Sequence, residues 1–405
     1  MQTLPRTLFP ALQRALADQR VIVLTGMRRV GKTTAARWLL DQAPSLNKLY
    51  LDLERLDNRA VFGESNYDLV LNFLRNRGLD LTQTAYVVLD EIQYVPNVPS
   101  VVKYLYDSQR IKFILTGSSS YYLKHYFTES LAGRKVVFEM FPLSFGEFLT
   151  FKGETWRPRA AFADMVFDPY EYERLKGFYE EYLAYGGLPE VVLTAAPETK
   201  TELLNDILSS YINIDVRAMA DFQKIAELQQ LLRVLASRIG NKLDNTKLAS
   251  IVGISRPTLL QYLEFLEKTY ILCRLPAYTS PDHASALGKK LYFYDNGIAG
   301  VLARLSEGAL FENAIFNQLR PYGDLTYLTK GNDNEIDFSL RPAGADERLA
   351  DEREPLALEV KVNPLPADLK RVRRLAAAHA LPAAHVIGRF PTPGFTEFVW
   401  GGLIF

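Results

Sequence analysis

Eight residues near the start of the chain have the types and the spacing of a loop that binds a nucleoside triphosphate. Residues 26–33 read G-M-R-R-V-G-K-T, between an apolar run at 21–24 and a helix-like run at 34–40. Glycine lets backbone N–H groups curl around an anion, and the positive end of the following helix then faces the phosphates. Lys32 would reach the β- and γ-phosphates, and the Thr33 hydroxyl would ligate Mg²⁺. A plain glycine-containing turn before a helix is the alternative, and the complete match in this context argues against it.

Two adjacent acids have the placement of the second half of such a site. Asp90 and Glu91 follow the apolar run 86–89, and a strand buried on both faces of a parallel sheet has such a continuous apolar run. Ligands bind at the C-terminal ends of the strands in these sheets. Asp90 would hold the Mg²⁺ shell, and Glu91 would orient and deprotonate the attacking water. The alternative is a strand that ends in two acids by chance. The phosphate-binding loop earlier in the chain argues against that alternative.

A third apolar run predicts a strand that carries a sensor of the γ-phosphate. Residues 112–118 read K-F-I-L-T-G-S, and we expect this strand between the two motif strands, with Thr116 or Ser118 as the sensor. A serine cap before a helix explains the same residues without excluding that role.

Arg134 is the candidate for a further catalytic residue, because it lies just before a predicted strand at 135–138. It would reach its own nucleotide as a sensor, or a neighbour's nucleotide as a finger. A structural ion pair is its alternative. We therefore predict Glu91, Lys32 and Arg134 as catalytic residues of the ATPase site. The predicted ligands of the nucleotide and its Mg²⁺ are Gly26, Arg28, Arg29, Val30, Gly31, Lys32, Thr33, Thr34, Asp90 and Ser118.

Charged residues of the C-terminal third have the pattern of a second phosphate-directed site. Asp337 lies on one predicted strand with Glu335 as a spare acid, Glu359 and Lys361 share a face of the next strand, and Glu312 lies early in a predicted helix. Converging acids repel each other unless a cation lies between them, and a second Mg²⁺ with Asp337 and Glu359 as ligands would satisfy them. Lys361 would position or activate water for attack on a phosphodiester. A core that binds without cutting and a solvated charged strand edge are the alternatives.

Residues 244–263 have the pattern of a helix-turn-helix, and two predicted strands, 270–275 and 290–293, could follow it as a wing. Ser255 would cap the second helix, which has a proline near its start. A DNA-binding version would present Ser255, Arg256, Thr258 and Gln261 to a groove, and the basic residues to test are Lys242, Lys247 and Arg256. A winged helix that contacts protein is the open alternative.

The elements that position these groups predict an α/β protein in four parts. Strands alternating with helices predict a parallel-sheet P-loop ATPase core at 1–155. Aromatic and acidic residues at helical spacing predict a helical linker or lid at 156–220, and a winged-helix domain would occupy 221–294. The C-terminal α/β domain would span 295–405 and includes a basic helix that could lie along a phosphate backbone.

Composition and charge exclude several classes of protein. Of the 405 residues 48% are hydrophobic and 23% are charged, which is typical of a globular protein, and the formal net charge of zero gives no global signal for nucleic acid. Cys273 is the one cysteine, so no intrachain disulfide can form. We find neither an apolar run long enough to cross a membrane nor a secretory signal, so we expect a cytoplasmic protein.

The chain resembles a prokaryotic family of AAA-type P-loop ATPases with a C-terminal domain long classed as of unknown function. The resemblance rests on G-x4-G-K-T at 26–33, L-D-E-I-Q at 89–93, L-T-G-S-S at 115–119, L-A-G-R at 131–134 and P-L-S-F-G-E-F at 142–148, and it spans nearly the whole chain. Many families share the first motifs, whereas the last two segments are far more particular.

The C-terminal acids resemble the PD-(D/E)xK nuclease core. Asp337, Glu359 and Lys361 match its motif, and Glu312 matches its helical acid. The resemblance implies a nuclease-like fold with Glu312 as a further Mg²⁺ ligand, and it leaves cleavage itself open.

The function that we expect is ATP binding and hydrolysis, coupled to a winged-helix and nuclease-like region that acts on DNA. The expected cofactors are ATP and Mg²⁺. A signalling or scaffold switch whose C-terminal domains bind protein is the alternative. A homo-oligomer is implied only if Arg134 acts as a finger toward a neighbour.

Overall fold

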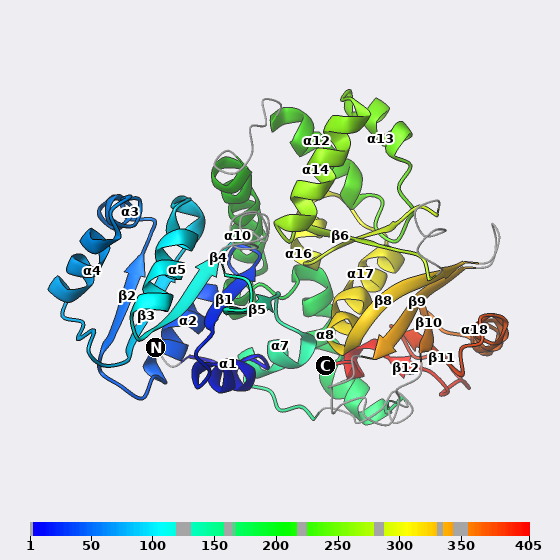
Figure 1. The fold of residues 1–405 in the computed structure, drawn as a ribbon. Helices are drawn as coiled ribbons and strands as arrows, with labels where there is room; N and C mark the ends of the chain where they lie inside the picture. Colours follow the sequence, from blue (N-terminus) through cyan, green and yellow to red (C-terminus); the bar gives the residue numbers. More distant parts are fainter. Residues whose placement is uncertain are drawn as a thin grey trace. The chain divides into compact units, whose positions relative to one another are not determined.

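The computed structural model describes residues 3–118, 131–157, 165, 167–216, 225–278, 287–329, 335–342 and 355–405 (Figure 1). Contacts divide the chain into two compact units. The N-terminal unit comprises residues 1–141 with 268–270, and the C-terminal unit comprises 142–267 with 271–405. The predicted parts beyond residue 155 therefore fall in the C-terminal unit, apart from that three-residue piece. Among the described residues, no helix combines the length and the apolar composition that crossing a bilayer requires.

A five-stranded parallel sheet forms the centre of the N-terminal unit, in the order β2-β3-β4-β1-β5, which confirms the predicted α/β core. The described elements of this unit are α1 (Phe9–Leu16), β1 (Val21–Gly26), α2 (Lys32–Asp41), β2 (Lys48–Asp52), α3 (Leu56–Phe62), α4 (Tyr67–Asn76), β3 (Ala85–Asp90), η1 (Ile92–Tyr94), α5 (Val98–Ser108), β4 (Ile111–Gly117) and β5 (Lys135–Met140).

The burial of each strand follows its place in this sheet. The inner strands β1, β3 and β4 are buried along their whole length, whereas the edge strands β2 and β5 are only partly buried. The continuous apolar runs predicted as strands are therefore the inner strands. Strand β4 lies between β1 and β3, as expected for the strand that carries the candidate sensor. Because all pairings are parallel, Gly26, Asp90 and Gly117 end these strands at one edge of the sheet.

Helices make up the first part of the C-terminal unit. Its described helices up to residue 216 are α7 (Phe145–Phe151), α8 (Pro169–Tyr185), α9 (Pro189–Leu193), α10 (Pro197–Ser210) and the π-helix η3 (Tyr211–Val216). The family-like segment 142–148 forms the start of α7. The Ser144 hydroxyl accepts a hydrogen bond from the Glu147 N–H, and the Glu147 carboxylate accepts one from the Ser144 N–H. This reciprocal capping box explains the S-x-x-E pattern of the segment.

Three helices and a two-stranded antiparallel ribbon follow in the chain. They are α12 (Ile225–Ala236), α13 (Asn245–Val252), α14 (Arg256–Lys268), β6 (Leu272–Leu275) and β7 (Lys290–Phe293). The Asp244 side chain caps α13 by accepting hydrogen bonds from two backbone N–H groups. These elements have the order expected of a winged helix, and the winged-helix identity itself stays a prediction.

A mixed five-stranded sheet occupies the last part of the chain, in the order β12-β11-β10-β9-β8. Strands β8, β9 and β10 are antiparallel neighbours, whereas β10, β11 and β12 are parallel. Helices α17 and α18 pack against this sheet. The elements are α16 (Asn296–Leu302), α17 (Glu307–Leu319), η4 (Arg320–Tyr322), β8 (Gly323–Thr329), β9 (Glu335–Pro342), β10 (Leu356–Lys361), α18 (Pro366–Ala378), β11 (Ala383–Gly388), β12 (Val399–Trp400) and η6 (Gly401–Leu403). The helix and strands predicted around the acids are present, and a nuclease fold stays a prediction.

Candidate functional site

The predicted phosphate-binding loop lies where β1 ends and α2 begins. β1 ends at Gly26, and α2 begins at Lys32. A Cβ on Gly26 would lie 2.0 Å from the carbonyl oxygen of Met140 on the neighbouring strand β5, so a larger residue would force that strand to move. Arg29 and Gly31 have positive φ angles of 67° and 97°. Such left-handed turns can aim backbone N–H groups at an anion.

The Lys32 side chain folds back onto this loop. Its Nζ donates hydrogen bonds to the carbonyl oxygens of Gly26 at 3.0 Å and Met27 at 2.9 Å, and the residue is only 4% exposed. Carbonyl oxygens are neutral and do not cancel the charge of the ammonium group. Lys32 can therefore exchange these bonds for phosphate oxygens, which is the role predicted for it.

The other predicted ligands of the loop have different surroundings. The Arg28 guanidinium lies 3.5 Å from the Glu54 carboxylate. Val30 is fully buried, Thr33 is half-buried, and Thr34 is exposed in the first turn of α2. Their contacts with a nucleotide stay predictions.

Asp90 is a buried carboxylate held by two hydroxyl groups. Its Oδ2 accepts a hydrogen bond from the Tyr50 hydroxyl at 2.5 Å, and its Oδ1 accepts one from the Thr116 hydroxyl. The Arg37 guanidinium lies 4.3 Å from the centre of the Tyr50 ring. Burial, and then the hydrogen bond to Asp90, raise the pKa of Tyr50, so the phenol keeps the proton that it donates. The carboxylate is thus fixed in orientation at the sheet edge that carries the loop.

Glu91 lies one residue beyond β3, in a left-handed backbone conformation with φ 55°. Its N–H donates to the Thr116 hydroxyl at 3.0 Å. The Gln93 side-chain amide donates to Glu91 Oε2 at 2.5 Å and to the Ser118 hydroxyl at 3.0 Å. A non-glycine residue with positive φ is uncommon, and such strain gathers at functional sites. The structure therefore joins the predicted base to both sensor candidates, to Thr116 directly and to Ser118 through Gln93, a glutamine that sequence reasoning did not single out.

Arg134 lies at the other end of the sheet from the phosphate-binding loop. Lys135 is the register partner of Val21, whereas Gly26 pairs with Met140 at the far end of the same two strands. Five steps along a strand span about 17 Å, so a role as sensor of its own nucleotide is not compatible with this position. The guanidinium instead forms two hydrogen bonds with Asp107, at 2.9 and 3.2 Å. The ion pair that was the alternative interpretation is present, and a role toward a neighbouring subunit stays a prediction.

The nucleotide region suits Mg²⁺ by the chemistry of its donors. Among the described residues, no group of three or more His, Cys, Asp or Glu side chains could hold a metal ion. Mg²⁺ at nucleotide sites keeps several waters and takes few protein ligands besides phosphate oxygens. A hydroxyl from Thr33 and a carboxylate from Asp90 are such a small set.

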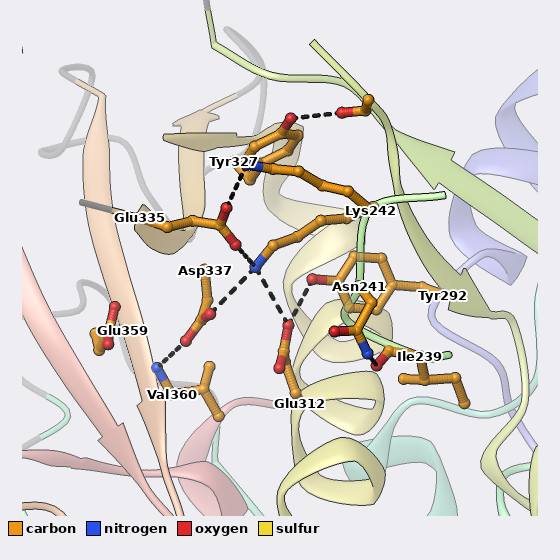
Figure 2. A network of polar contacts seen from close by, with 12 residues as sticks. Ile239, Asn241, Lys242, Tyr292, Glu312, Tyr327, Glu335, Asp337, Glu359 and Val360 are labelled. Carbon is orange, nitrogen blue, oxygen red and sulfur yellow. Dashed lines mark hydrogen bonds and ion pairs between the residues drawn. The ribbon is translucent and has the colours of Figure 1, made fainter. Parts of the chain in front are cut away.

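A cluster of charged side chains in the C-terminal unit surrounds Lys290 of β7, and Figure 2 shows three of its acids, Glu312, Glu335 and Asp337. Its Nζ lies 2.8 Å from Glu335 Oε1, 3.3 Å from Asp337 Oδ1 and 3.6 Å from Glu312 Oε1. We call this group the acid–lysine cluster. Its members are Glu312, Glu335, Asp337, Glu359, Lys242, Lys290, Lys361 and Arg371.

The surroundings of Glu312 keep this carboxyl beside Lys290. It accepts a hydrogen bond from the Tyr292 hydroxyl at 2.7 Å. Gly240, with φ 76°, leaves room for it, since a Cβ there would lie 2.8 Å from Glu312 Oε2. Burial, and then the charge of Asp337, raise the pKa of Glu312 to about 7. Burial alone would lower the pKa of Lys290, but the charges of Asp337 and Glu312 outweigh it and raise that pKa overall.

Asp337 and Glu359 are held by further donors. Asp337 Oδ2 accepts the Val360 N–H at 2.9 Å, and Glu359 Oε1 lies 2.8 Å from Lys361 Nζ and 2.7 Å from Arg371. The second oxygen of Glu359 is buried and has no hydrogen-bond partner within the described part of the chain. Burial raises the pKa of Glu359.

The predicted second Mg²⁺ does not fit the acid–lysine cluster as it is folded here. Asp337 and Glu359 were predicted as ligands because converging acids need a cation, and Glu312 was added through the resemblance. The chain itself supplies a cation beside Glu312 and Asp337, the ammonium of Lys290. The described residues contain no group of acids with the geometry of a metal site. Lys361, predicted to activate water, is paired with Glu359.

Two lysines of this cluster differ from their sequence-based interpretation. Lys242 was grouped with the basic residues that would contact DNA, but its Nζ lies 2.7 Å from Glu335 Oε2. Lys290 was treated only as the first residue of a wing strand. The sequence does contain a signal for the role of Lys290, since it begins a short apolar strand. A lysine buried with such a strand requires a carboxylate partner.

The proposed DNA-facing residues of α13 and α14 remain largely accessible. Lys247, Ser255, Arg256 and Gln261 are exposed, whereas Thr258 is half-buried and hydrogen-bonded to Ser255. Their contact with a groove stays a prediction.

Two family models match this chain, one largely in each of its two units. A family model described as an AAA domain matches residues 18–149, and one described as a domain of unknown function (DUF8612) matches residues 177–309. An uncharacterized protein of Methanocaldococcus jannaschii is 29% identical over 339 residues, covering 80% of this chain and 73% of that protein. An uncharacterized protein of Haemophilus influenzae is 27% identical over 336 residues, covering 79% of each.

Solved structures give weaker likenesses. The Walker-type ATPase of Pyrococcus abyssi is 16% identical with a TM-score of 0.48, over 74% of this chain and 96% of that one. The Aeropyrum pernix ORC1 protein, solved in complex with DNA, is 14% identical with a TM-score of 0.31, over 75% and 91% of the two chains. These scores are too low to carry an argument, and the comparisons give no support for a nuclease fold. The AAA-domain match, the 26–33 loop and the parallel sheet together support a P-loop ATPase family for the N-terminal part of the chain.

Proposed function

We propose that this chain hydrolyses ATP at the 26–33 loop with Mg²⁺ as cofactor, and that the nucleotide state controls nucleic-acid binding by its C-terminal unit. The observation that supports the ATPase part is the placement of Lys32, Asp90 and Glu91 at one edge of the parallel sheet. This is the edge at which parallel sheets bind ligands.

Each of these residues has a separate task in hydrolysis. Lys32 leaves the loop carbonyls and binds the β- and γ-phosphates, where its charge stabilises the transition state. Thr33 and Asp90 would hold Mg²⁺, which would supply neutralisation of the phosphate charge. Glu91 orients the attacking water and accepts its proton. Gln93 holds the Glu91 carboxylate through a hydrogen bond and links it to Ser118.

Turnover and binding measured separately test the ATPase part. Glu91→Gln should retain Mg²⁺-dependent binding of a fluorescent ATP analogue but lose turnover, because an amide cannot accept the proton. Lys103→Ala, an exposed lysine on α5, is the matched control and should behave as wild type. Wild-type turnover in Glu91→Gln would remove Glu91 as the base.

Exposed basic residues support the nucleic-acid part. Lys247 and Arg256 lie on α13 and α14, and Lys370, Arg373 and Arg374 lie on α18. Lysine and arginine contacts with phosphates release counterions, so such binding weakens as salt is added. Fluorescence anisotropy with labelled DNA should show salt-dependent affinity that falls in a Lys247→Ala, Arg256→Ala double variant. Absence of salt-dependent binding would overturn this part.

A switch that binds protein is the second candidate, because exposed apolar side chains lie on the same helices. Ile251 on α13 is 41% exposed, and Leu260 on α14 is 37% exposed. Apolar side chains gain little from contact with a phosphate backbone but are common in protein interfaces. Unchanged DNA binding in the basic variant, together with nucleotide-dependent protein association lost in Leu260→Ser, would favour this candidate.

The acid–lysine cluster favours binding without cleavage, since its acids already have cationic partners. Incubation of DNA with Mg²⁺ should give equal products for wild type and Asp337→Ala. Cleavage by wild type that Asp337→Ala loses would instead establish a nuclease.

A further inference from the structure

Lys290 is a buried lysine whose burial demands carboxylate partners. The residue is 2% exposed, and its Nζ lies within 3.6 Å of carboxylate oxygens from three residues. Removing an ammonium group from water is strongly unfavourable unless opposite charges and hydrogen bonds replace the water. Figure 2 shows the side chains of Glu312, Glu335 and Asp337 pointing toward one another. The ammonium of Lys290 lies within 3.6 Å of all three, where a metal ion would lie if these acids were its ligands.

The backbone places two lysines beside these acids. Residues 240–243 run antiparallel to β7, with backbone hydrogen bonds between Gly240 and Leu291 and between Asn241 and Leu291. Lys242 and Lys290 are bridge partners in this pairing. Glu335 therefore binds one lysine with each carboxylate oxygen, Lys290 at 2.8 Å and Lys242 at 2.7 Å. The ring of Tyr327 lies 5.1 Å from the Lys242 ammonium and 5.7 Å from that of Lys290.

The acidic side chains of the cluster are matched in number by cationic side chains of the described residues. Its four carboxylates face four cationic side chains, namely Glu312, Glu335, Asp337 and Glu359 against Lys242, Lys290, Lys361 and Arg371. A divalent ion would add two positive charges next to the Lys290 ammonium, at hydrogen-bond distance from the same oxygens. Like charges at such distances repel strongly in a buried site. A divalent cation and Lys290 therefore exclude each other.

We propose that Lys290 is the resident cation of a latent divalent-cation site, so that the folded chain holds these acids without metal and binds a divalent ion there only when Lys290 is removed or withdrawn. The acids come from α17, β9 and β10, whereas Lys242 and Lys290 come from the segment that precedes them. The ribbon strand β7 thus acts as the element that closes the site. Among the described residues, the buried Oε2 of Glu359 has no hydrogen-bond partner, so the cationic side chains leave one acid oxygen of the cluster unsatisfied. The proposal does not depend on ATP binding.

Titration of Mn²⁺ into nucleotide-free protein tests this proposal. Wild type should show no saturable site below millimolar concentrations, by the electron paramagnetic resonance signal of free Mn²⁺. Lys290→Ala should bind one Mn²⁺ per chain, and Asp337→Asn added to it should abolish that site. Lys242→Ala is the matched control, since Lys242 pairs with the same Glu335 but leaves Lys290 in place, and it should bind none.

Thermal unfolding supplies a second readout that tolerates a weakened variant. Because a ligand that binds only the folded state stabilises it, Mn²⁺ should raise the Tm of Lys290→Ala but not that of wild type or Lys242→Ala. If Lys290→Ala does not fold, the variant Lys290→Ala with Glu335→Gln keeps Glu312 and Asp337 and restores the balance of charge. A folded variant without Lys290 that neither binds nor is stabilised by Mn²⁺ overturns the proposal. So does a saturable Mn²⁺ site in wild type that Asp337→Asn removes.

Discussion

Two buried lysines in this chain are held by opposite kinds of partner. Lys32 donates to the carbonyl oxygens of its own loop, whereas Lys290 lies among three carboxylates. Lys32 and Lys290 are 4% and 2% exposed, so burial does not separate them.

The difference shows what each site is prepared to bind. A lysine on neutral carbonyls keeps its charge for an incoming anion, because exchanging a carbonyl for a phosphate oxygen gains an ionic interaction. A lysine on carboxylates has its charge neutralised already, so its region needs no further ion. The carbonyl partners of Lys32 therefore suit an exchange for an anionic ligand, whereas the carboxylate partners of Lys290 suit a region that holds its own cation.

The largest expected effect is on the stability of the C-terminal unit. Lys290→Ala leaves buried carboxylates without their cation and should lower the free energy of unfolding by about 3–5 kcal/mol. Lys242→Ala removes a more exposed partner of the same acid and should cost about 1 kcal/mol or less. Urea unfolding followed through the buried Trp400 measures both. Equal losses in the two variants would mean that Lys290 is not the centre of the cluster.

The next effect is mainly on turnover. Lys32→Ala should lower ATP hydrolysis by about 100- to 1,000-fold, the range seen when one donor to a charged transition state is removed. Its unfolding midpoint should fall less than that of Lys290→Ala, because the hydrogen bonds of Lys32 to Gly26 and Met27 go to neutral carbonyl oxygens. Steady-state turnover and thermal unfolding of the same preparation give both numbers. A Lys32 variant that loses stability as Lys290→Ala does would break the comparison.

Asp295 is a buried ionisable group whose hydrogen-bond partners are backbone N–H groups, and its expected effect on stability is smaller than that of Lys290. Asp295 is fully buried, accepts hydrogen bonds from the Gly187 and Ile298 N–H groups, and burial raises its pKa to about 6 from 3.8. The folded pKa lies above the unfolded value, so this contribution to stability is present below pH 3.8 and is lost as pH rises through 6. The shift of about 2 units corresponds to at most about 3 kcal/mol.

Unfolding of wild type and Asp295→Asn at about pH 4 and about pH 7 isolates that contribution. Wild type should lose stability relative to Asp295→Asn as the pH rises from about 4 to about 7. The altered hydrogen bond in the variant adds a stability difference that is the same at both pH values. A difference that stays constant would show that Asp295 titrates at its ordinary pKa.

The smallest expected effect concerns an exposed ion pair. Arg134→Ala breaks the contact with Asp107, in which both side chains are more than a third exposed, and should change stability by about 0.2–1 kcal/mol. Turnover of the isolated chain should not change, because Arg134 lies at the opposite end of the sheet from the loop. Loss of turnover only at protein concentrations that favour association would restore its role as a finger.

Much of the N-terminal unit could be predicted because its information is local. Inner parallel strands appear as continuous apolar runs, and Lys32 and Asp90 lie in short motifs with a fixed relation to those strands. The position of Arg134 was also available from the sequence, since a residue before a parallel strand lies at the end away from the ligands. The role of Gln93 could not be predicted from the sequence, because it depends on a hydrogen bond to Ser118, 25 residues away.

The acid–lysine cluster could be predicted only in part. Alternation along β9 and β10 correctly placed the acids on shared faces. Their cation was assigned to a metal because Lys290 lies 47 residues before Asp337, and a four-residue apolar strand does not indicate which acids it will meet. Partners that distant are fixed by tertiary packing rather than by a local pattern.

The antiparallel pairing of Lys242 with Lys290 also bears on how this protein can be divided for study. A boundary at residue 294 looks natural in the sequence, but it separates both lysines from Glu312, Glu335 and Asp337. A fragment that ends there would carry an unneutralised lysine on a formerly buried strand, and a fragment that begins there would carry repelling acids. We therefore expect the two segments to unfold together, and we expect neither to fold well without the other.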